Sequence, residues 1–431
     1  MTSPGSPPGS GRAAARRRWL AGVACSAVLI VPAAAAVTGG RTPAAASVSS
    51  MAATVTRQAV TPADQFLGVS CPADRFCLGV GWYIPSDGVK RPLAQRWDGS
   101  AWHIMFPLVP SPAPAAVLRS VACASRTSCL AVGDTNTSGD HGPVFGKLFA
   151  EKWNGSTWRM VPIDDPGRAT LAKVSCASAT SCFAVGYRTT VTGADRAISE
   201  HWNGKRWSYV RPRRPQPLSQ LLGVSCPALR NCYAAGWTGT LQSVSRRALI
   251  EHWDGARWST RPLSGTPRNS VLRSVACPAR TRCTAVGATG GSSPRMLVED
   301  LRGGRWHASV LSHKPVNPGN LGLDDVSCRG PRVCSAVTRY ISVANDTLTW
   351  SIATRGRTGG FRFQLLPARA AFDDPRDLSC SAHGCTLVGG KGSSDGRGDS
   401  FDTGSTLAWR SGPGLSFAPQ ATPPPPTTAG G

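Results

Sequence analysis

The chain has 431 residues and a formal net charge of +24, from 48 lysines and arginines against 24 aspartates and glutamates. Such a balance attracts acidic polymers, but the basic residues are spread along a chain that is also rich in alanine, glycine and proline. We therefore expect no specific nucleic-acid binding. Only four glutamates occur, so a pair of catalytic carboxylates of the kind that glycosidases use would have to come from aspartates.

Residues 1–36 have the three parts of a secretory signal peptide. A basic stretch that ends in Arg16-Arg17-Arg18 precedes an apolar run, which begins at Trp19 and ends among alanines. The run is close to the shortest that spans a bilayer, so an uncleaved N-terminal anchor is the alternative. We expect a secreted, extracellular protein, either free, cell-surface associated or N-terminally anchored, with no membrane span in the mature chain. Residues 37–62 are predicted to form a flexible spacer.

Fourteen of the fifteen cysteines form seven short pairs, which recur at intervals of 50 to 53 residues. An interval of this length indicates a repeat architecture. The fifteenth, Cys25, lies in the apolar N-terminal run.

The pairs are predicted to be disulfides rather than metal ligands. Zinc sites favour two or four residues between cysteines and a second pair close by, whereas six of these pairs have five intervening residues. Disulfides form and persist outside the cytoplasm, which agrees with an export signal. The expected bridges are Cys71–Cys77, Cys123–Cys129, Cys176–Cys182, Cys226–Cys232, Cys277–Cys283, Cys328–Cys334 and Cys380–Cys385.

The fourth repeat shows the structural unit most clearly. It has four short runs of strand-forming residues separated by turn residues, and the cysteine pair lies across the first turn. Asp254-Gly255 between the last two runs predicts a type I′ turn, which needs positive φ at both central residues. The same dipeptide position holds Asp98-Gly99, Asn154-Gly155 and Asn203-Gly204 in the first three repeats.

Four antiparallel strands per fifty residues is the size of a β-propeller blade. A single blade has two apolar faces, which are buried when blades stack and the ring closes. The sequence therefore predicts an all-β fold, a seven-bladed β-propeller over residues 63–418, with four antiparallel strands and one hairpin disulfide per blade. Residues 419–431, which include four consecutive prolines, predict a disordered Pro-rich tail.

The repeat L-x-x-V-[SA]-C-x5-C-x-A-V-G … E-x-W-[DN]-G-x-x-W resembles that of secreted, actinobacterial-type β-propeller-like repeat proteins. The resemblance covers about 350 residues. It implies a propeller fold and an extracellular location. It brings no catalytic residues, because the function of that family is largely unassigned.

Tryptophans and glutamates recur in register with the cysteines. Tryptophan pairs bracket the Asx-Gly turn in the first four repeats, Trp306 continues the pattern, and Phe361 and Phe417 stand at the last tryptophan position in repeats six and seven. We expect these rings to pack between blades rather than to stack on sugars. The glutamates share one repeated position and are expected to be structural: Glu151, Glu200, Glu251 and Glu299.

Two loops that depart from the repeat are the candidate sites, at residues 134–141 and 395–402. Each offers oxygen ligands on a glycine-containing loop, as a Ca²⁺ site would, although neither has the EF-hand spacing. The candidate metal ligands are Asp134, Asp140, Asp395, Asp399 and Asp402. No nucleophile elbow, phosphate loop or dinucleotide fingerprint occurs, so no catalytic or cofactor-binding residue is predicted.

The leading hypothesis is a secreted, monomeric and non-enzymatic propeller. It would act as a binding or scaffold module for a cell-wall polymer, glycan or protein through its non-repeating loops. One alternative is a polysaccharide hydrolase or lyase acting at the central channel, which requires non-repeating acids to converge there. The other is electrostatic binding of acidic polymers, with an affinity that falls steeply with salt.

Overall fold

The computed structural model describes residues 63–111, 115–136, 146–213, 217–241, 245–290, 294–311, 322–342, 347–356, 359–366, 372–392, 405–411 and 417–425. All of them belong to a single structural unit, Gln58–Gly431. Within these ranges the chain forms β-strands and turns. None of the described segments is a helix with the length and hydropathy needed to cross a membrane.

The described strands form seven sheets, each built from one continuous stretch of chain and antiparallel apart from one edge strand in blade 5. Blades 1 to 4 consist of β1 (Ala63–Ala73), β2 (Phe76–Ile84), β3 (Arg91–Trp97), β4 (Trp102–Met105); β5 (Ala115–Ser125), β6 (Ser128–Asn136), β7 (Leu148–Trp153), β8 (Trp158–Val161); β9 (Ala169–Ser178), β10 (Ser181–Thr189), β11 (Asp195–Trp202), β12 (Trp207–Tyr209); and β13 (Leu218–Ala228), β14 (Asn231–Gly239), β15 (Arg247–Trp253), β16 (Trp258–Thr260). Blades 5 to 7 consist of β17 (Leu263–Ser264), β18 (Ser270–Ala279), β19 (Arg282–Thr289), β20 (Arg295–Arg302), β21 (Arg305–Val310); β22 (Gly322–Gly330), β23 (Val333–Ser342), β24 (Thr347–Arg355), β25 (Arg362–Leu365); and β26 (Phe372–Cys380), β27 (Cys385–Gly392), β28 (Ser405–Ser411), β29 (Phe417–Gln420).

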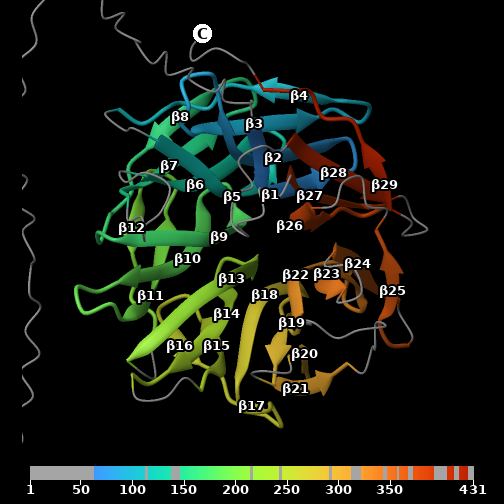
Figure 1. Cartoon of the computed structure of the whole chain (residues 1–431). Helices are drawn as coiled ribbons and strands as arrows, with labels where there is room; N and C mark the ends of the chain where they lie inside the picture. Colours follow the sequence, from blue (N-terminus) through green and yellow to red (C-terminus); the bar gives the residue numbers. More distant parts are fainter. Residues whose placement is uncertain are drawn as a thin grey trace, which may run out of the picture. The chain divides into compact units, whose positions relative to one another are not determined.

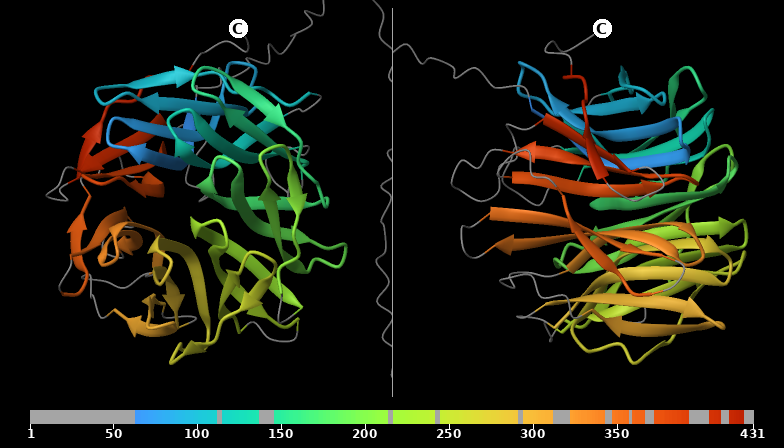
Figure 2. Two further views of the ribbon diagram at one scale, coloured as in Figure 1. Left: turned by 180° about the vertical axis from the view of Figure 1, so that it is seen from behind. Right: turned by 90° about the vertical axis from the view of Figure 1, so that its right-hand side faces the viewer.

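The seven blades stand around a central axis (Figure 1). In each blade, one edge strand of the sheet lies nearest the axis. These innermost strands contact one another in the order β1, β5, β9, β13, β18, β22 and β26, and β26 contacts β1 to close the ring. Figure 2 shows the same ring from behind and from the side. Blade 5 has one extra edge strand, β17, which pairs in parallel with β21. The seven-bladed β-propeller predicted from the sequence is confirmed.

One disulfide closes the hairpin between the two innermost strands of every blade, as expected. Cys176 and Cys182 are direct cross-strand partners, and across all seven bridges the Cα atoms lie 3.9–4.1 Å apart. Closing a loop of about seven residues restricts the unfolded chain and contributes roughly 2 kcal/mol in the chain-entropy account.

The turn between the third and fourth strands differs from the predicted type I′ turn. In blade 1 it has four residues, and only Gly99 has a positive φ, +108°. The Asp98 carboxylate accepts hydrogen bonds from the backbone N–H groups of Ser100 (2.7 Å) and Ala101 (2.9 Å). The type I′ prediction is wrong here because this Asx side chain, rather than a second left-handed residue, reverses the chain. A Cβ at Gly99 would lie 2.7 Å from Nε of Arg75, so that exposed side chain would have to move.

Each tryptophan pair of blades 1 to 4 packs in the seam with the preceding blade, and blade 7 precedes blade 1 in the closed ring. Trp153 and Trp158, whose ring centroids are 5.6 Å apart, pack against Leu78 and Val80 of the preceding blade. The equivalent pairs are Trp97/Trp102, Trp202/Trp207 and Trp253/Trp258. All eight rings are at most 8% exposed, so they are packing elements and not sugar-stacking platforms.

The four repeated glutamates are completely buried, as a structural role requires. They lie under the linkers that lead from one blade to the next. The backbone N–H of Leu108 donates to Glu151 and that of Arg213 donates to Glu251, each at 2.9 Å. Glu200 differs, because neither of its carboxylate oxygens has a hydrogen-bond partner.

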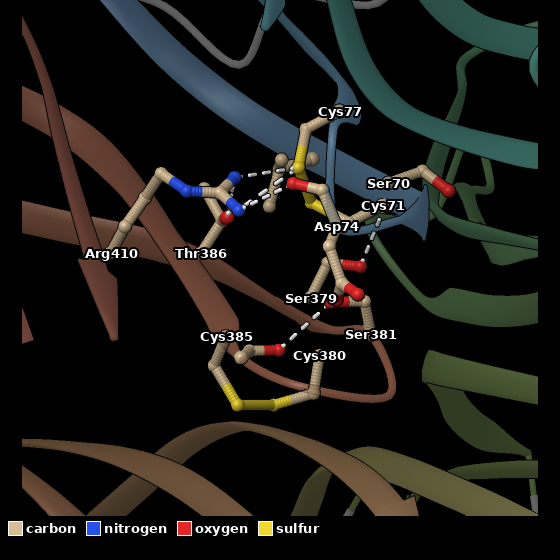
Figure 3. Close-up of a disulfide and its surroundings, with 12 residues drawn as sticks. Ser70, Cys71, Asp74, Cys77, Ser379, Cys380, Ser381, Cys385, Thr386 and Arg410 are labelled. Carbon is tan, nitrogen blue, oxygen red and sulfur yellow. Dashed lines mark hydrogen bonds between the residues drawn. A yellow bond between two sulfur atoms is a disulfide. The ribbon is translucent and has the colours of Figure 1, made fainter. Parts of the chain in front are cut away.

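Blades 7 and 1 close the ring without exchanging a strand. The close-up in Figure 3 shows the side chain of Arg410 reaching from blade 7 toward the disulfide of blade 1. Its guanidinium donates to the carbonyl of Asp74 (2.8 Å) and to Thr386 Oγ1 (2.7 Å). On the inner side, the backbone N–H of Cys71 donates to Ser379 Oγ (2.9 Å). Polar contacts therefore fasten this seam.

The chain remains ordered slightly beyond the predicted end of the ring. β29 continues to Gln420, two residues past residue 418. Further on, the carbonyl of Pro423 accepts a hydrogen bond from the buried Gln95 of blade 1 (3.1 Å).

Candidate functional site

A charged cluster from three blades lies between the innermost strands of the ring. Lys173 of β9 forms ion pairs with Asp325 of β22 and Asp377 of β26, and its Nζ lies 3.3 Å from Asp325 Oδ1. Ser274 of β18 donates a hydrogen bond to the same oxygen (2.6 Å). The two carboxylates outweigh the effect of burial and raise the pKa of Lys173. Four innermost strands thus meet at one point on the axis.

The two aspartates lie close together, and their oxygens are held by contacts within the ring. Leu378 N–H donates to Asp325 Oδ2 and Val69 N–H to Asp377 Oδ2, both at 2.8 Å. Burial and the Asp325 charge raise the pKa of Asp377 to about 8, although Lys173 opposes this; for Asp325 the Lys173 charge outweighs burial and lowers the pKa. Opposite shifts are typical of catalytic pairs, but here all four oxygens have partners and the two side chains are at most 6% exposed. The cluster ties blades together.

A small cavity of about 200 Å³ lies on the cysteine side of this cluster. It is lined by the residue that precedes the first cysteine of each blade, which is serine in five blades and alanine in two. Each serine hydroxyl accepts a hydrogen bond from the cysteine N–H of the next blade, at 2.9–3.0 Å: Ser70, Ser175, Ser225, Ser327 and Ser379. Ligand pockets usually have volumes of roughly 300–1,000 Å³, so the channel is a poor candidate site.

Of the five candidate metal ligands, only Asp134 lies among the described residues. It is 2% exposed, and Arg119 holds both of its oxygens, with Nη2 3.0 Å from Oδ1. Within the described ranges, no group of three or more histidine, cysteine, aspartate or glutamate side chains could hold a metal ion. Asp140, Asp395, Asp399 and Asp402 lie outside the described residues, so a Ca²⁺ site on their loops stays a prediction.

The seam between blades 5 and 6 departs from the tryptophan pattern. The third-strand residue opposite the second cysteine is tryptophan in blades 1 to 4, but it is Leu301 in blade 5, Arg355 in blade 6 and Ser411 in blade 7. Arg355 is the charged one of these three replacements. Arg355 donates from Nη1 and Nη2 to the two carboxylate oxygens of Asp300 in blade 5, at 2.7 and 2.8 Å. Its Nη2 also donates to Thr284 Oγ1 (2.7 Å). An ion pair thus replaces an aromatic contact.

This ion pair is shielded from solvent, with side chains 13% exposed for Arg355 and 7% for Asp300. Burial alone would raise the pKa of Asp300, but hydrogen bonding and the charge of Arg355 outweigh it and hold the pKa below its usual value. Arg302 also contacts Asp300 (2.7 Å). The guanidinium of Arg355 lies over the ring of Phe361, 4.9 Å from its centroid.

A cavity of about 510 Å³ opens at this seam. We call it the seam cavity. Four arginines and one carboxylate line it, together with apolar side chains of β20 and the ring of Phe361: Arg282, Arg302, Arg332, Arg355 and Asp300. Its volume lies within the usual range for small-molecule and sugar-sized ligands. Excess positive charge beside apolar surface suits an anionic ligand that also has apolar faces.

The seam cavity was not predicted from the sequence, because its arginines come from separate segments between residues 282 and 355. A signal was nevertheless present. Arg355 precedes Phe361 by six residues, close to the five-residue spacing of the tryptophan pairs. Arg355 follows Cys334 by 21 residues, the spacing that also separates Cys232 from Trp253, so alignment of the repeats on their second cysteine would have placed an arginine at a tryptophan position.

No family model matches the chain, and no curated protein matches it. Similar solved structures include YCF48 bound to a D1 peptide (13% identity, TM-score 0.46, covering 76% of this chain and 89% of that one) and YCF48 from Cyanidioschyzon merolae (11%, 0.45, 76% and 92%). Another is the GH74 xyloglucanase from Xanthomonas campestris (13%, 0.49, 81% and 55%); the chain spans about half of its length. None of these similarities assigns a ligand or an activity to this chain.

Proposed function

We propose that this chain is a non-enzymatic binding module whose ligand docks in the seam cavity between blades 5 and 6. The ligand is a cell-wall polymer, glycan or protein outside the cytoplasm. The observation that carries the proposal is the replacement of an inter-blade tryptophan by Arg355, which accompanies a cavity of about 510 Å³.

Folding of the ring gives no reason for this replacement. A void forfeits packing contacts, and a buried ion pair is often no more stabilising than apolar residues of similar volume. Blades 3 and 4 achieve a closed seam with Phe183 packed against Trp253 (5.0 Å between ring centroids). A departure from the scaffold that costs stability is typical of a functional site.

The location rests on the cysteines and the N-terminal segment. Seven disulfides persist in an oxidising compartment, and residues 1–36 have the pattern of an export signal. Both support a ligand on the cell surface or beyond it.

We propose a non-enzymatic role because of how the acidic side chains between the innermost strands are held. In the part of the chain that the structure describes, Asp325 and Asp377 are a close carboxylate pair of the kind that a channel hydrolase would need. Their oxygens accept hydrogen bonds from Leu378 N–H and Val69 N–H and contact Lys173, so neither carboxylate is free to donate a proton to a glycosidic oxygen.

The test is retention of the full-length protein on cell-wall fractions and on glycan and peptide arrays. A triple variant, Thr284→Phe with Asp300→His and Arg355→Trp, copies the residues that meet at the closed seam of blades 3 and 4. Those residues are Phe183, His201 and Trp253. The variant should keep its thermal stability and lose at least about tenfold in affinity for whatever the wild type binds, since the cavity is filled.

The control is Arg257→Gln on blade 4, whose side chain is 84% exposed and lines no part of the cavity. It should bind like the wild type. Equal retention of the folded triple variant and the wild type would place the ligand elsewhere. A wild-type protein that binds no wall fraction and no array ligand would overturn the binding function itself.

A further inference from the structure

A second depression adjoins the seam cavity on the same side of the ring. It has a volume of about 670 Å³ and is lined by the disulfide hairpin of blade 6 and by Ala382 in the hairpin of blade 7. Arg282, Pro331 and Arg332 line both depressions. The two depressions therefore lie side by side, from blade 5 across blade 6.

The two depressions carry strong positive charge. Arg329 joins the four arginines of the seam cavity, and Asp300 is the carboxylate among the lining residues of the two depressions. Asp300 is already paired with Arg355 and Arg302. No described carboxylate forms an ion pair with Arg282, Arg329 or Arg332, so these three guanidinium groups can bind external anions.

This concentration of arginine is particular to blades 5 and 6. The hairpin turns between the paired cysteines hold two arginines each in these blades, Arg280 and Arg282 in blade 5 and Arg329 and Arg332 in blade 6. The corresponding turns of the other five blades hold at most one. The basic hairpins thus flank the seam at which Arg355 takes the tryptophan position, and these two departures from the repeat coincide in space.

The chemistry of the lining distinguishes among polyanions. Val298, Leu301 and Leu311 bring apolar surface to the seam cavity, and Phe361 adds an aromatic ring. A polyphosphate has no apolar face to place there. A sugar ring has one, and a carboxylate on that ring accepts a two-pronged hydrogen bond from arginine.

We propose that the two depressions form one binding groove for an acidic polysaccharide. In this groove Arg282, Arg329 and Arg332 hold the carboxylates of neighbouring sugars, and Phe361 packs against a sugar ring. This inference rests on the proposed function, because it names the ligand class of the same site. It also predicts that one sugar binds weakly and that a chain long enough to reach both depressions binds more tightly.

The test is calorimetric titration of the full-length protein with carboxylate-bearing oligosaccharides of one to eight sugars, from galacturonate, alginate and hyaluronan. Methyl-esterified oligogalacturonates of the same lengths are the neutral probes. Affinity should rise by about tenfold or more from monomer to hexamer, fall by a similar factor on esterification, and fall again in 0.5 M salt because exposed charges are screened.

Variants separate the two halves of the groove. Arg329 lines only the blade 6 depression. The substitution Arg329→Gln should therefore reduce the increase in affinity with chain length and leave the affinity for the monomer unchanged. Arg230→Gln is the matched control, an exposed hairpin arginine of blade 4 that lines neither depression. It should leave every affinity unchanged.

Three results would overturn the inference: no binding of any carboxylate-bearing oligosaccharide, equal binding of esterified chains, or tighter binding of polyglutamate or polyphosphate. Failure of the ligand class is distinguishable from failure of the site. If a neutral glycan or a protein binds the wild type and not the filled-cavity triple variant, the proposed function stands and the acidic polysaccharide is wrong.

Discussion

Arg355 of blade 6 and Asp300 of blade 5 form a two-pronged ion pair, with nitrogen–oxygen distances of 2.7 and 2.8 Å. The pair occupies the register positions that Trp253 and His201 hold at the seam of blades 4 and 3. It keeps adjacent blades connected while giving up aromatic packing. If the proposed ligand binds here, stability and binding are coupled at this seam, and each can be measured separately.

Arg355→Leu should lower the free energy of unfolding by about 3 kcal/mol, because it leaves the buried Asp300 with Arg302 as its remaining ion-pair partner. Adding Asp300→Asn should recover most of that loss. Denaturant unfolding at pH 7 measures both. Since the pKa of Asp300 is lowered in the folded protein, its contribution is present at neutral pH and is lost as the pH falls through the acidic range. An equal effect of Arg355→Leu at pH 7 and pH 3 would contradict this account.

The fold could be predicted from the sequence because each repeat carries the same local information. Cysteines such as Cys176 and Cys182 fix one hairpin per blade, and the tryptophans that bracket Gly204 fix the other. The turn type was less accessible, because dipeptide preference does not reveal that the Asn203 side chain accepts hydrogen bonds from Lys205 and Arg206.

The sites depend on contacts that cross the ring, and local patterns do not record them. Lys173 meets Asp325 and Asp377 across sequence separations of 152 and 204 residues. Asp134 was a candidate metal ligand because it begins a polar loop, yet Arg119 on the paired strand holds it. A carboxylate in an irregular loop is ambiguous until its neighbours on other strands are known.

Lys173→Met should destabilise the ring by about 3 kcal/mol, because it removes the cation that two buried carboxyl groups share. Adding Asp325→Asn should restore most of the stability, since the amide oxygen can still accept the hydrogen bond from Leu378 N–H. Denaturant unfolding of both variants gives the comparison. If the free energy of unfolding of Lys173→Met lies within about 0.5 kcal/mol of the wild-type value, the ion pairs of Lys173 with Asp325 and Asp377 do not stabilise the ring.

Ser225→Ala should cost about 1 kcal/mol, because the N–H of Cys277 loses its hydrogen-bond acceptor in the neighbouring blade. The reverse change, Ala122→Ser, places a hydroxyl at the position from which five other blades make this bond, and it should stabilise the protein by a smaller amount. Thermal unfolding of the two variants beside the wild type is sufficient. The two variants should change the melting temperature in opposite directions. Changes in the same direction would argue against a stabilising role for these hydrogen bonds between blades.

Glu200 makes stability depend on pH in the opposite sense to Asp300. It is completely buried without hydrogen-bond partners, and burial together with the charges of Asp164 and Asp165 raises its pKa to about 8. Between its unfolded pKa, near 4.5, and pH 8, the unfolded chain ionises while the folded chain retains the proton. Folding then requires proton uptake, so stability should decrease across this window, by on the order of 4 kcal/mol from this residue, and level off above it.

Glu200→Gln removes the ionisation and keeps the shape of the side chain. The variant should match the wild type near pH 4.5 and unfold at a higher temperature than the wild type at pH 8. Asp165→Asn is the companion variant, which weakens the electrostatic part of the shift and should flatten the pH dependence only partly. Thermal unfolding from pH 4 to pH 9 tests all three proteins. Parallel profiles for wild type and Glu200→Gln would mean that Glu200 ionises in the folded protein as it does in water, and that burial at this position does not control its proton.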